Sequence, residues 1–454
     1  MGLVSLNHYG RKELVELICN NTPLHYGRVY YNEKLVNSYQ FNTHIENKIS
    51  VIEKRSHLVE DLNIIENIFM LKKKCKMYFM KPKILCSQLN HFTKELDLEF
   101  NGTELIKNIT VYERKLIELI KATIMGNKLI IIDNISEIIS ENELKKFQQF
   151  LIHYSKKGFS ILYVSNQLEE TFAICNRVAI MENGQILRVL DGQDLTKDKI
   201  APYQVSIPYK QEVKEYLNDA EGFFQFKNVY YNRMRNLSFF VREAECITLL
   251  DTEHLLLQDF IDLLVEPKKI EQGEILYHHI GYSEKKGRNH IQKGICIINQ
   301  SPIENALFKE MSYIDNLCFL LEQKIEGLRL NKRIKHSIMK EYERYVGEDI
   351  YKKNITNLST RSYYNLVYYS VHLCKPSIVF LIQPFLQADL YSRLHIIHLI
   401  RQLKKRGIAV VILATSLFEN LMICDRLYVI QDGKCKHEYK KEELAYLEDT
   451  NFKS

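Results

Sequence analysis

Short apolar runs recur along this chain, and amphipathic segments separate them. Examples are KLIIID (128–133), FSILYVS (159–165) and AVVILAT (409–415). Continuous apolar strands indicate a parallel sheet that is covered on both faces, because a sheet with one wet face would alternate apolar and polar residues. The segment NELKKFQQFLIHYSKKG (142–158) has helical periodicity. The pattern therefore predicts an α/β fold in which helices cover mostly parallel sheets.

The chain contains an internal duplication. RVAIMENGQIL (177–187) resembles RLYVIQDGKCK (426–436), which lies 249 positions later. Further upstream, YGRVYY (26–31) matches QGEILY (272–277) at an offset of 246, so three inserted residues separate the blocks. A register held over this span predicts two domains of one fold. We place them at 1–205 and 221–454, with a linker at 206–220.

The two halves differ at their starts. The second half carries extra residues before its first shared block, including FFQFKNVYYNRMRNLSFFVREAECITLL (223–250), whereas the first half begins almost at that block. We expect a first domain without the opening strands of its partner, either because the fold is truncated or because the start codon is wrongly chosen. Each half also contains a long helical insertion, at 60–125 and 305–375.

Composition excludes several function classes. No apolar run approaches the length of a membrane span, and the N-terminus lacks the pattern of a signal peptide. The ten cysteines show no C-x-x-C or zinc-type spacing, so we expect reduced thiols. A net charge of +6 with interspersed acids and bases gives nucleic-acid binding no electrostatic support. These features favour a cytoplasmic protein that does not bind nucleic acid.

An acid stands where one predicted strand ends. In LIIIDNISEII (129–139), Asp133 follows four apolar residues and Asn134 follows the acid. The repeat of this stretch, IVFLIQPFLQ (378–387), has Ile382 and Gln383 at the two positions. A carboxylate at the end of a buried parallel strand is typical of Mg²⁺ sites in phosphate-hydrolysing proteins, but it is also compatible with a strand that simply ends.

The blocks and their spacing, SNQLEETFAICNRVAIMENGQIL (165–187) above all, resemble those of ATP-binding cassette (ABC) proteins. The likeness is to the tandem-cassette ATP-binding subunits of ribose- and galactose-type sugar importers, and it covers nearly the whole chain. It implies two P-loop NTPase-like cassettes, each with a sheet core and a helical subdomain. It also implies ATP with Mg²⁺ as cofactor. The likeness is weakest at the residues of the catalytic positions, so it predicts the fold and not the activity.

The segment SLNHYGRKE (5–13) resembles the phosphate loop of that family, G-x-x-x-x-G-K-[ST]. Gly10 matches the second glycine, Arg11 replaces the lysine and Lys12 replaces the hydroxyl residue. Arg11 can hold a phosphate through two hydrogen bonds, whereas Lys12 cannot ligate Mg²⁺. An ordinary helix N-terminus with basic residues is the alternative. The candidate nucleotide-binding residues of this segment are Ser5, Asn7, Gly10, Arg11, Lys12 and Glu13.

The resemblance also assigns the remaining positions. Asp133 stands at the Mg²⁺ acid, and Asn134 replaces a general base, which is worth about 10²–10⁴-fold in rate. Asn166 and Thr415 replace the switch histidines. The glutamine that links nucleotide to permease falls near 53–54, where neither residue is a glutamine.

The signature loops, which cap the γ-phosphate of the opposite cassette in the family, are also altered. They read ITVYE (109–113) and LSTRS (358–362), and Ser359 keeps the signature serine. Head-to-tail pairing would join this serine with Gly10, Arg11 and Asp133 in one partial site. The other site depends on ECITLLDTEHLLLQDF (245–260), which contains no glycine, lysine or arginine. We therefore expect at most one nucleotide, bound weakly and without efficient turnover.

Three hypotheses remain for the function. The first is a pseudo-ATPase with a regulatory or scaffolding role, docked through its helical insertions on a permease at the inner face of the membrane. The second is an active ATP-binding subunit that energises a sugar importer through one composite site. The third, a decaying gene product, is opposed by the well-kept apolar strands. We expect the first, with the cassettes pairing inside the chain or in a homodimer.

Overall fold

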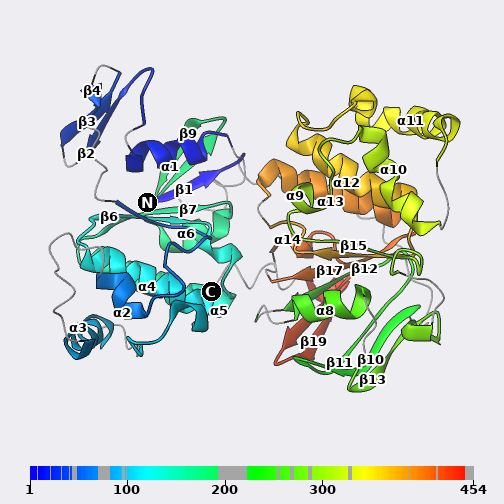
Figure 1. The fold of residues 1–454 in the computed structure, drawn as a ribbon, viewed down its shortest axis with the longest axis horizontal. Coiled ribbons are helices and arrows are strands. Elements are labelled where there is room, and N and C mark those ends of the chain that lie inside the picture. Colours follow the sequence, from blue (N-terminus) through cyan, green and yellow to red (C-terminus); the bar gives the residue numbers. More distant parts are fainter. Residues whose placement is uncertain are drawn as a thin grey trace. The chain divides into compact units, whose positions relative to one another are not determined.

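The computed structural model divides into two compact units, Met1–Pro208 and Tyr209–Ser454. Figure 1 shows helices and sheets in each unit, and each is described by itself below. The linker expected at 206–220 lies outside the described residues. The model describes residues 1–444 apart from 8, 21, 32, 40, 43–48, 70–81, 95–97, 99, 193–221, 252, 254–255, 266–269, 285–288, 326–329, 387 and 416–417.

A six-stranded sheet forms the core of the first unit. Its order is β5-β6-β7-β1-β8-β9, and every neighbouring pair is parallel except β8 and β9. Ile130, Ile131 and Ile132 are fully buried, as the continuous apolar run predicts for a strand covered on both faces. The strands are β1 (Gly2–Ser5), β5 (Ile49–Ile52), β6 (Leu129–Asp133), β7 (Ser160–Ser165), β8 (Arg177–Glu182) and β9 (Gln185–Asp191).

Helices cover both faces of this sheet. Figure 1 shows α1 on one side and α2, α4 and α5 on the other. Thr110 and Ser140 begin α4 and α5 with capping boxes completed by Glu113 and Glu143, which satisfy the first backbone N–H groups. The helices are α1 (Arg11–Asn20), α2 (Ile64–Phe69), α3 (Pro82–Lys94), α4 (Val111–Ile124), α5 (Glu141–Lys156) and α6 (Leu168–Ile174), with 3₁₀ turns at Ile106–Asn108 and Ile135–Glu137.

The second unit repeats this core. Its sheet has the order β15-β16-β17-β12-β18-β19, again with only the last pair antiparallel. Gly2 is paired with Val178 in the first sheet, and Thr248 is paired with Leu427 in the second, so the offsets of 246 and 249 hold in the structure. The strands are β12 (Cys246–Asp251), β15 (Ile295–Ile298), β16 (Ile378–Ile382), β17 (Ala409–Ala414), β18 (Arg426–Gln431) and β19 (Lys434–Lys440).

An antiparallel sheet with the order β11-β10-β13-β14 accompanies the second core. Its first two strands come from the extra residues before the first shared block, as the sequence predicts. In the first unit a three-stranded sheet with the order β2-β3-β4 contains the counterparts of β13 and β14. The strands are β10 (Phe224–Tyr231), β11 (Met234–Val241), β13 (Gln272–Tyr277), β14 (Ile280–Gly281), β2 (Arg28–Tyr31), β3 (Lys34–Ser38) and β4 (Phe41–Asn42).

The helical insertion of the second unit lies on the face opposite α8 and the antiparallel sheet (Figure 1). Its longest helices begin with side-chain caps from Asn331 and Ser359. Among the described helices, none combines the length and hydropathy that a membrane span requires. The helices are α8 (Leu257–Val265), α9 (Pro302–Asn305), α10 (Tyr313–Lys324), α11 (Lys332–Val346), α12 (Thr360–Cys374), α13 (Leu390–Lys405) and α14 (Phe418–Leu421), with 3₁₀ turns at Tyr282–Glu284 and Gly347–Tyr351.

Candidate functional site

The loop between β1 and α1 packs tightly against the β8–β9 turn. Gly10 has φ 80°, and a Cβ atom added to it would lie 2.5 Å from the Cα of Gly184. Only glycine fits a left-handed backbone in such close contact. The Gly10 carbonyl accepts the Leu14 N–H at 2.9 Å as α1 begins. Packing alone therefore requires Gly10, whether or not a phosphate binds.

Two other predicted residues hold this loop, and one of them, Asn7, ties it to the same turn. Asn7 Oδ1 accepts the backbone N–H of Asn183 at 3.1 Å and that of Tyr9 at 3.3 Å, while Asn7 Nδ2 donates to Asn183 Oδ1 at 2.9 Å. The Ser5 hydroxyl donates to the Asn7 carbonyl. Both side chains are buried. Their polar groups hold the loop in shape.

A chain of hydrogen bonds joins the candidate catalytic positions of the first unit. Arg11 Nη1 donates to Asn166 Oδ1 at 2.7 Å. The Asn166 N–H donates to Asn134 Oδ1 at 3.1 Å, and Asn134 Nδ2 donates to Asp133 Oδ1 at 3.0 Å. Asn134 adopts the left-handed conformation, with φ 49° and ψ 42°. The structure thus brings Arg11, Asp133, Asn134 and Asn166 together, and the carboxamide of Asn134 lies between the metal position and the switch position.

Asp133 carries the negative charge of this cluster. Burial raises the pKa of its carboxyl group, although the Arg11 guanidinium opposes the shift. Lys12 lies outside the cluster, because its side chain is 83% exposed and reaches Glu16 at 3.7 Å. Glu13 is also exposed. Lys12 stands where the family has a hydroxyl residue and cannot ligate Mg²⁺, which leaves Asp133 as the only metal ligand that the sequence predicts; Arg11 and the start of α1 suit a phosphate group.

Ser359 lies in the second unit at the start of α12. Its Oγ accepts the Ser362 N–H at 3.1 Å and contacts Ser362 Oγ at 2.8 Å. Thr110 holds the same position in the first unit, where Glu113 completes its capping box. Both signature positions therefore serve as helix N-caps, which gives Ser359 a local structural role.

The second unit closes the corresponding loop with its own carboxylate. Asp251 ends β12 at the position of Ser5 in the first unit, and it is 3% exposed. Its Oδ2 accepts the Leu256 N–H at 2.7 Å, and its Oδ1 accepts the Glu253 N–H at 3.3 Å. These backbone donors point at an anion that belongs to the protein. The fixed negative charge opposes a phosphate at this place.

The comparisons with known proteins agree with this architecture. No protein-family model matches the chain. Ribose import ATP-binding protein RbsA of Clostridium tetani (strain Massachusetts / E88) is 25% identical over 465 residues, covering 98% of this chain and 90% of its own. Galactose/methyl galactoside import ATP-binding protein MglA of Clostridium perfringens (strain 13 / Type A) is 22% identical over 463 residues, covering 98% and 89%. A solved structure described as RNase-L Inhibitor aligns over 99% of this chain and 88% of its own, with a TM-score of 0.59 at 14% identity, which establishes a shared fold.

The chain is similar over 98% of its length to tandem-length ABC ATP-binding proteins of ribose and galactose import, and it shares the ABC cassette fold. The resemblance inferred from the sequence is confirmed, and so are the two cassettes of mostly parallel sheets. The two units are called cassettes below.

The second cassette contains a glutamine that sequence reasoning missed. Gln300 follows β15 at the position that Lys54 holds after β5, 246 residues earlier. It donates through Nε2 to Gln383 Oε1, and Gln383 Nε2 donates to Thr415 Oγ1 at 2.9 Å. Gln383 has φ 46°, close to that of Asn134. Applying the front-block offset of 246 to the second half would have identified Gln300. In both cassettes a carboxamide now connects the base position to the switch position.

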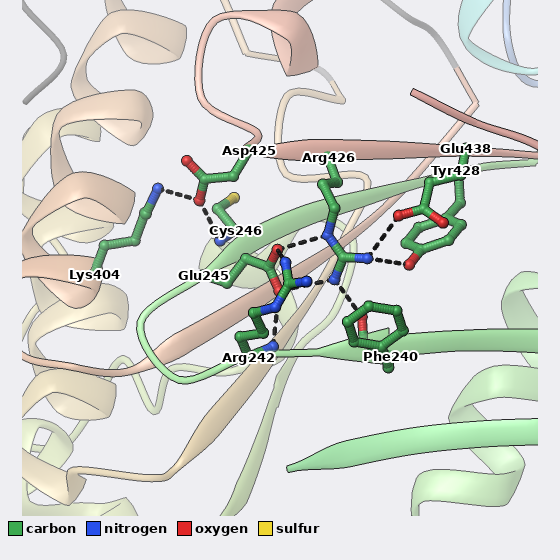
Figure 2. Close-up of polar contacts among 9 residues, drawn as sticks. All are labelled: Phe240, Arg242, Glu245, Cys246, Lys404, Asp425, Arg426, Tyr428 and Glu438. Carbon is green, nitrogen blue, oxygen red and sulfur yellow. Dashed lines mark hydrogen bonds and ion pairs between the residues drawn. The ribbon is translucent and has the colours of Figure 1, made fainter. Parts of the chain in front are cut away.

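Figure 2 shows a charge cluster of the second cassette, which lies at the junction of its two sheets. Arg426 donates to Glu245 at 2.6 and 2.9 Å, to Glu438 at 2.8 Å and to the Phe240 carbonyl at 2.8 Å. Alongside, Asp425 accepts from Lys404 at 2.6 Å and from the Cys246 N–H at 2.8 Å. Every one of these contacts is within the protein, so the cluster joins β11, β12, β18 and β19 and has no part in the candidate site.

Proposed function

We propose that this ABC protein is a pseudo-ATPase that uses its cassette fold for regulation or scaffolding. Its place would be the cytoplasmic side of a membrane permease of the carbohydrate-importer class, where the helical subdomains would dock. The names of the curated relatives, which are ribose and galactose import proteins, support this class. A single weakly held ATP in the first cassette is the ligand that we propose.

The observation that carries the proposal is the carboxamide at both base positions. Asn134 donates to Asp133 and accepts from Asn166, and Gln383 donates to Thr415. An amide at these positions cannot take a proton from an attacking water, and its hydrogen bonds hold it between two groups that would otherwise face the nucleotide. The arrangement supports binding without efficient hydrolysis.

A calorimetric titration with ATP–Mg²⁺, paired with phosphate-release measurements, tests the proposal. We expect measurable binding to the wild type, loss of binding in Arg11→Ala, and no phosphate release above that of Asp133→Ala. Asp61→Ala is the matched control, because the Asp61 carboxylate is 88% exposed and, among the described residues, forms an ion pair only with Lys107, at 3.5 Å. Phosphate release by the wild type that Asp133→Ala abolishes and Asp61→Ala preserves would contradict the proposal.

The alternative function is an active ATP-binding subunit that energises a sugar importer through one composite site. The proximity of Arg11 and Asp133 in a single cassette favours this alternative, since the candidate phosphate-binding residue and the candidate metal-binding residue are thereby close together. Hydrolysis that appears only when the permease is added would establish this alternative. ATP affinity weaker than millimolar, with no gain from the permease, would exclude it.

A further inference from the structure

A lysine lies beside Asp133, at the end of the neighbouring strand. β5 and β6 are parallel neighbours, with Ile52 opposite Ile132. Lys54 and Asp133 therefore lie at the same carboxyl edge of the sheet. Burial and the charge of Arg11 lower the pKa of the Lys54 ammonium group to about 8, and the charge of Asp133 opposes the shift. The charges of both residues thus reach Lys54 at the edge where open α/β sheets bind their ligands.

A buried acid holds this lysine. Glu137 forms an ion pair with Lys54, and the exposed fractions of the two side chains are 8% and 30%. Neither carboxylate oxygen of Glu137 accepts a hydrogen bond in the part of the chain that the structure describes. A buried ion pair costs desolvation energy, which its attraction offsets only with good geometry and further hydrogen bonds. Fold stability is therefore a weak reason for this pair.

The second cassette keeps the fold without any of these charges. The offset of 246 gives the counterparts of Arg11 and Lys54, and the offset of 249 gives those of Asp133 and Glu137. All four counterparts are neutral: Leu257, Gln300, Ile382 and Leu386. The two cations and two acids therefore belong to the first cassette alone, which is also the one with a candidate phosphate loop. This coincidence indicates that they serve a ligand and not the shared fold.

These charges do not suit the Mg²⁺ that the family resemblance implies. Mg²⁺ at a nucleotide is usually bound through one or two carboxylates together with the phosphates. Asp133 is the candidate carboxylate, but the positive charges of Lys54 and Arg11 lie close to it. Glu53, another acid whose charge reaches Asp133, contacts His57 at 3.0 Å. A dication at Asp133 would be repelled by two neighbouring cations, so the residues present do not fit this ion.

We propose that the first cassette binds the phosphates of ATP without Mg²⁺, and that Lys54 provides the positive charge at the place of the metal. The inference rests on the proposed function, in which this cassette takes up one ATP. The ammonium group of lysine has three hydrogen-bond donors and binds phosphate as a point charge. When ATP binds, Lys54 turns from Glu137 towards a phosphate oxygen, and Arg11 donates to the phosphates from the start of α1. Asp133 keeps the ammonium group at the strand end.

A complex without the metal agrees with occupancy rather than turnover. In phosphoryl transfer, metal ions bridge the β- and γ-phosphate oxygens and neutralise the charge that develops there. A lysine carries one positive charge where Mg²⁺ carries two, so the residues that hold ATP leave hydrolysis without its usual electrostatic support. The ligand of the proposed pseudo-ATPase is then free ATP, which carries more negative charge than its Mg²⁺ complex.

Calorimetric titration of the full chain with ATP, in excess MgCl₂ and in EDTA at equal ionic strength, tests the proposal. We expect the affinity for ATP in EDTA to be no more than about threefold weaker than in MgCl₂, because Lys54 takes the place of the metal. A larger loss in EDTA would overturn the proposal and leave the proposed function standing. Binding in neither solution would overturn both.

Lysine-to-glutamine variants locate the charge. Lys54→Gln introduces the residue type of the second cassette and should weaken binding of ATP in EDTA at least about tenfold, because a charge-assisted hydrogen bond is lost. Lys107→Gln is the matched control, since the Lys107 side chain is 52% exposed and pairs with Asp61 at 3.5 Å. The double variant with Lys54→Gln and Glu137→Gln should lose the same affinity, and it leaves no unpaired buried carboxylate to unfold the cassette. Unchanged affinity in the double variant, or an equal loss in Lys107→Gln, would overturn the proposal.

Discussion

Arg177 and Arg426 hold equivalent positions in the two cassettes, but they contribute differently to folding stability. Arg426 is 4% exposed and held by two carboxylates. The Arg177 side chain is 59% exposed and, within the described residues, forms an ion pair only with Asp191, at 2.8 Å. Burial alone would lower the pKa of the Arg426 guanidinium, but the hydrogen bonds and charge of Glu245 raise it above its usual value. Arg426 therefore stays charged over the whole pH range in which the protein is folded.

This contrast gives a matched prediction. Arg426→Ala should destabilise the second cassette by about 3–5 kcal/mol, because it leaves the buried carboxylate of Glu245 without its partner. Arg177→Ala should cost about 0–1 kcal/mol in the first cassette, as removal of an exposed pair normally does. Chemical denaturation of the full chain measures both. Equal effects of the two substitutions would show that the buried network does not stabilise the fold.

Asp133 gives a prediction about pH. An acid whose pKa is higher in the folded than in the unfolded chain binds its proton more tightly when folded, so its ionisation lowers stability as pH rises through that window. Asp133→Asn should therefore stabilise the first cassette at pH 7. The gain should shrink as pH falls and vanish below about 4, where the unfolded carboxyl also becomes protonated.

Denaturation of the first cassette between pH 4 and pH 7 measures this gain. Asp61→Asn is the control, because its carboxylate is 88% exposed. A gain independent of pH would mean that packing, and not the ionisation of Asp133, is responsible. A confirmed gain would show that the fold retains a destabilising acid at this strand end, which favours a ligand-related role for Asp133.

At the scale of elements, the same strand–loop–helix unit closes in two ways. In the first cassette the loop is held by neutral contacts from Ser5 and Asn7 and by the contact of Gly10 with Gly184. In the second, a buried carboxylate accepts the loop's backbone N–H groups. In the first cassette the positive end of α1 is left for an external anion such as phosphate. In the second cassette the carboxylate of Asp251 takes that place.

Asp251→Ala tests the second solution. It should destabilise the second cassette by about 1–3 kcal/mol, since removal of the carboxylate leaves the buried Leu256 N–H without its acceptor. Asp262→Ala is the control in the neighbouring α8, because the half-buried Asp262 accepts a hydrogen bond from Gln258 at 2.8 Å and does not bond to the loop in the part of the chain that the structure describes. Denaturation midpoints of the two variants measure the difference. A midpoint for Asp251→Ala equal to that of Asp262→Ala would show that the carboxylate does not hold the loop.

Elements of this kind mark the limit of sequence-based prediction here. The continuous apolar runs predicted the strands around Ile131 and Phe380, because a strand that is buried on both faces has apolar residues throughout. The constant offset between the repeats predicted that the two sheets have the same strand order. The sequence around Asp251 and Asn7 did not predict their hydrogen-bond partners, which are backbone groups of loops and turns that come close only in the folded chain. Arg426 was seen only as part of a repeated block, since its partners lie as far as 186 positions away in the chain.

At the scale of the whole molecule, duplication has given two cassettes of one topology with opposite consequences for a phosphate. The first places Arg11 at the start of α1 and bonds it to Asn166, and the second places Leu257 there beside a buried carboxylate. A retained fold with unequal loops supports a chain that takes up one nucleotide and uses the other cassette for structure. Asn134 and Gln383 stand at the two base positions that the resemblance assigns, so under the proposed function occupancy and not turnover is the quantity that such a chain would regulate.

This asymmetry sets the expected stoichiometry. Titration of the full chain with ATP–Mg²⁺ should give at most one site per chain, because the carboxylate of Asp251 repels a phosphate from the second loop. Arg11→Ala should remove that site, whereas Gln258→Ala, an exposed position one residue into α8, should leave the affinity unchanged. Since the guanidinium supplies charge-assisted hydrogen bonds worth roughly 1.5–3 kcal/mol, the loss should be about tenfold or more in affinity. Two equivalent sites would contradict the asymmetry, and a site that survives Arg11→Ala but not Gln258→Ala would assign the nucleotide to the second cassette.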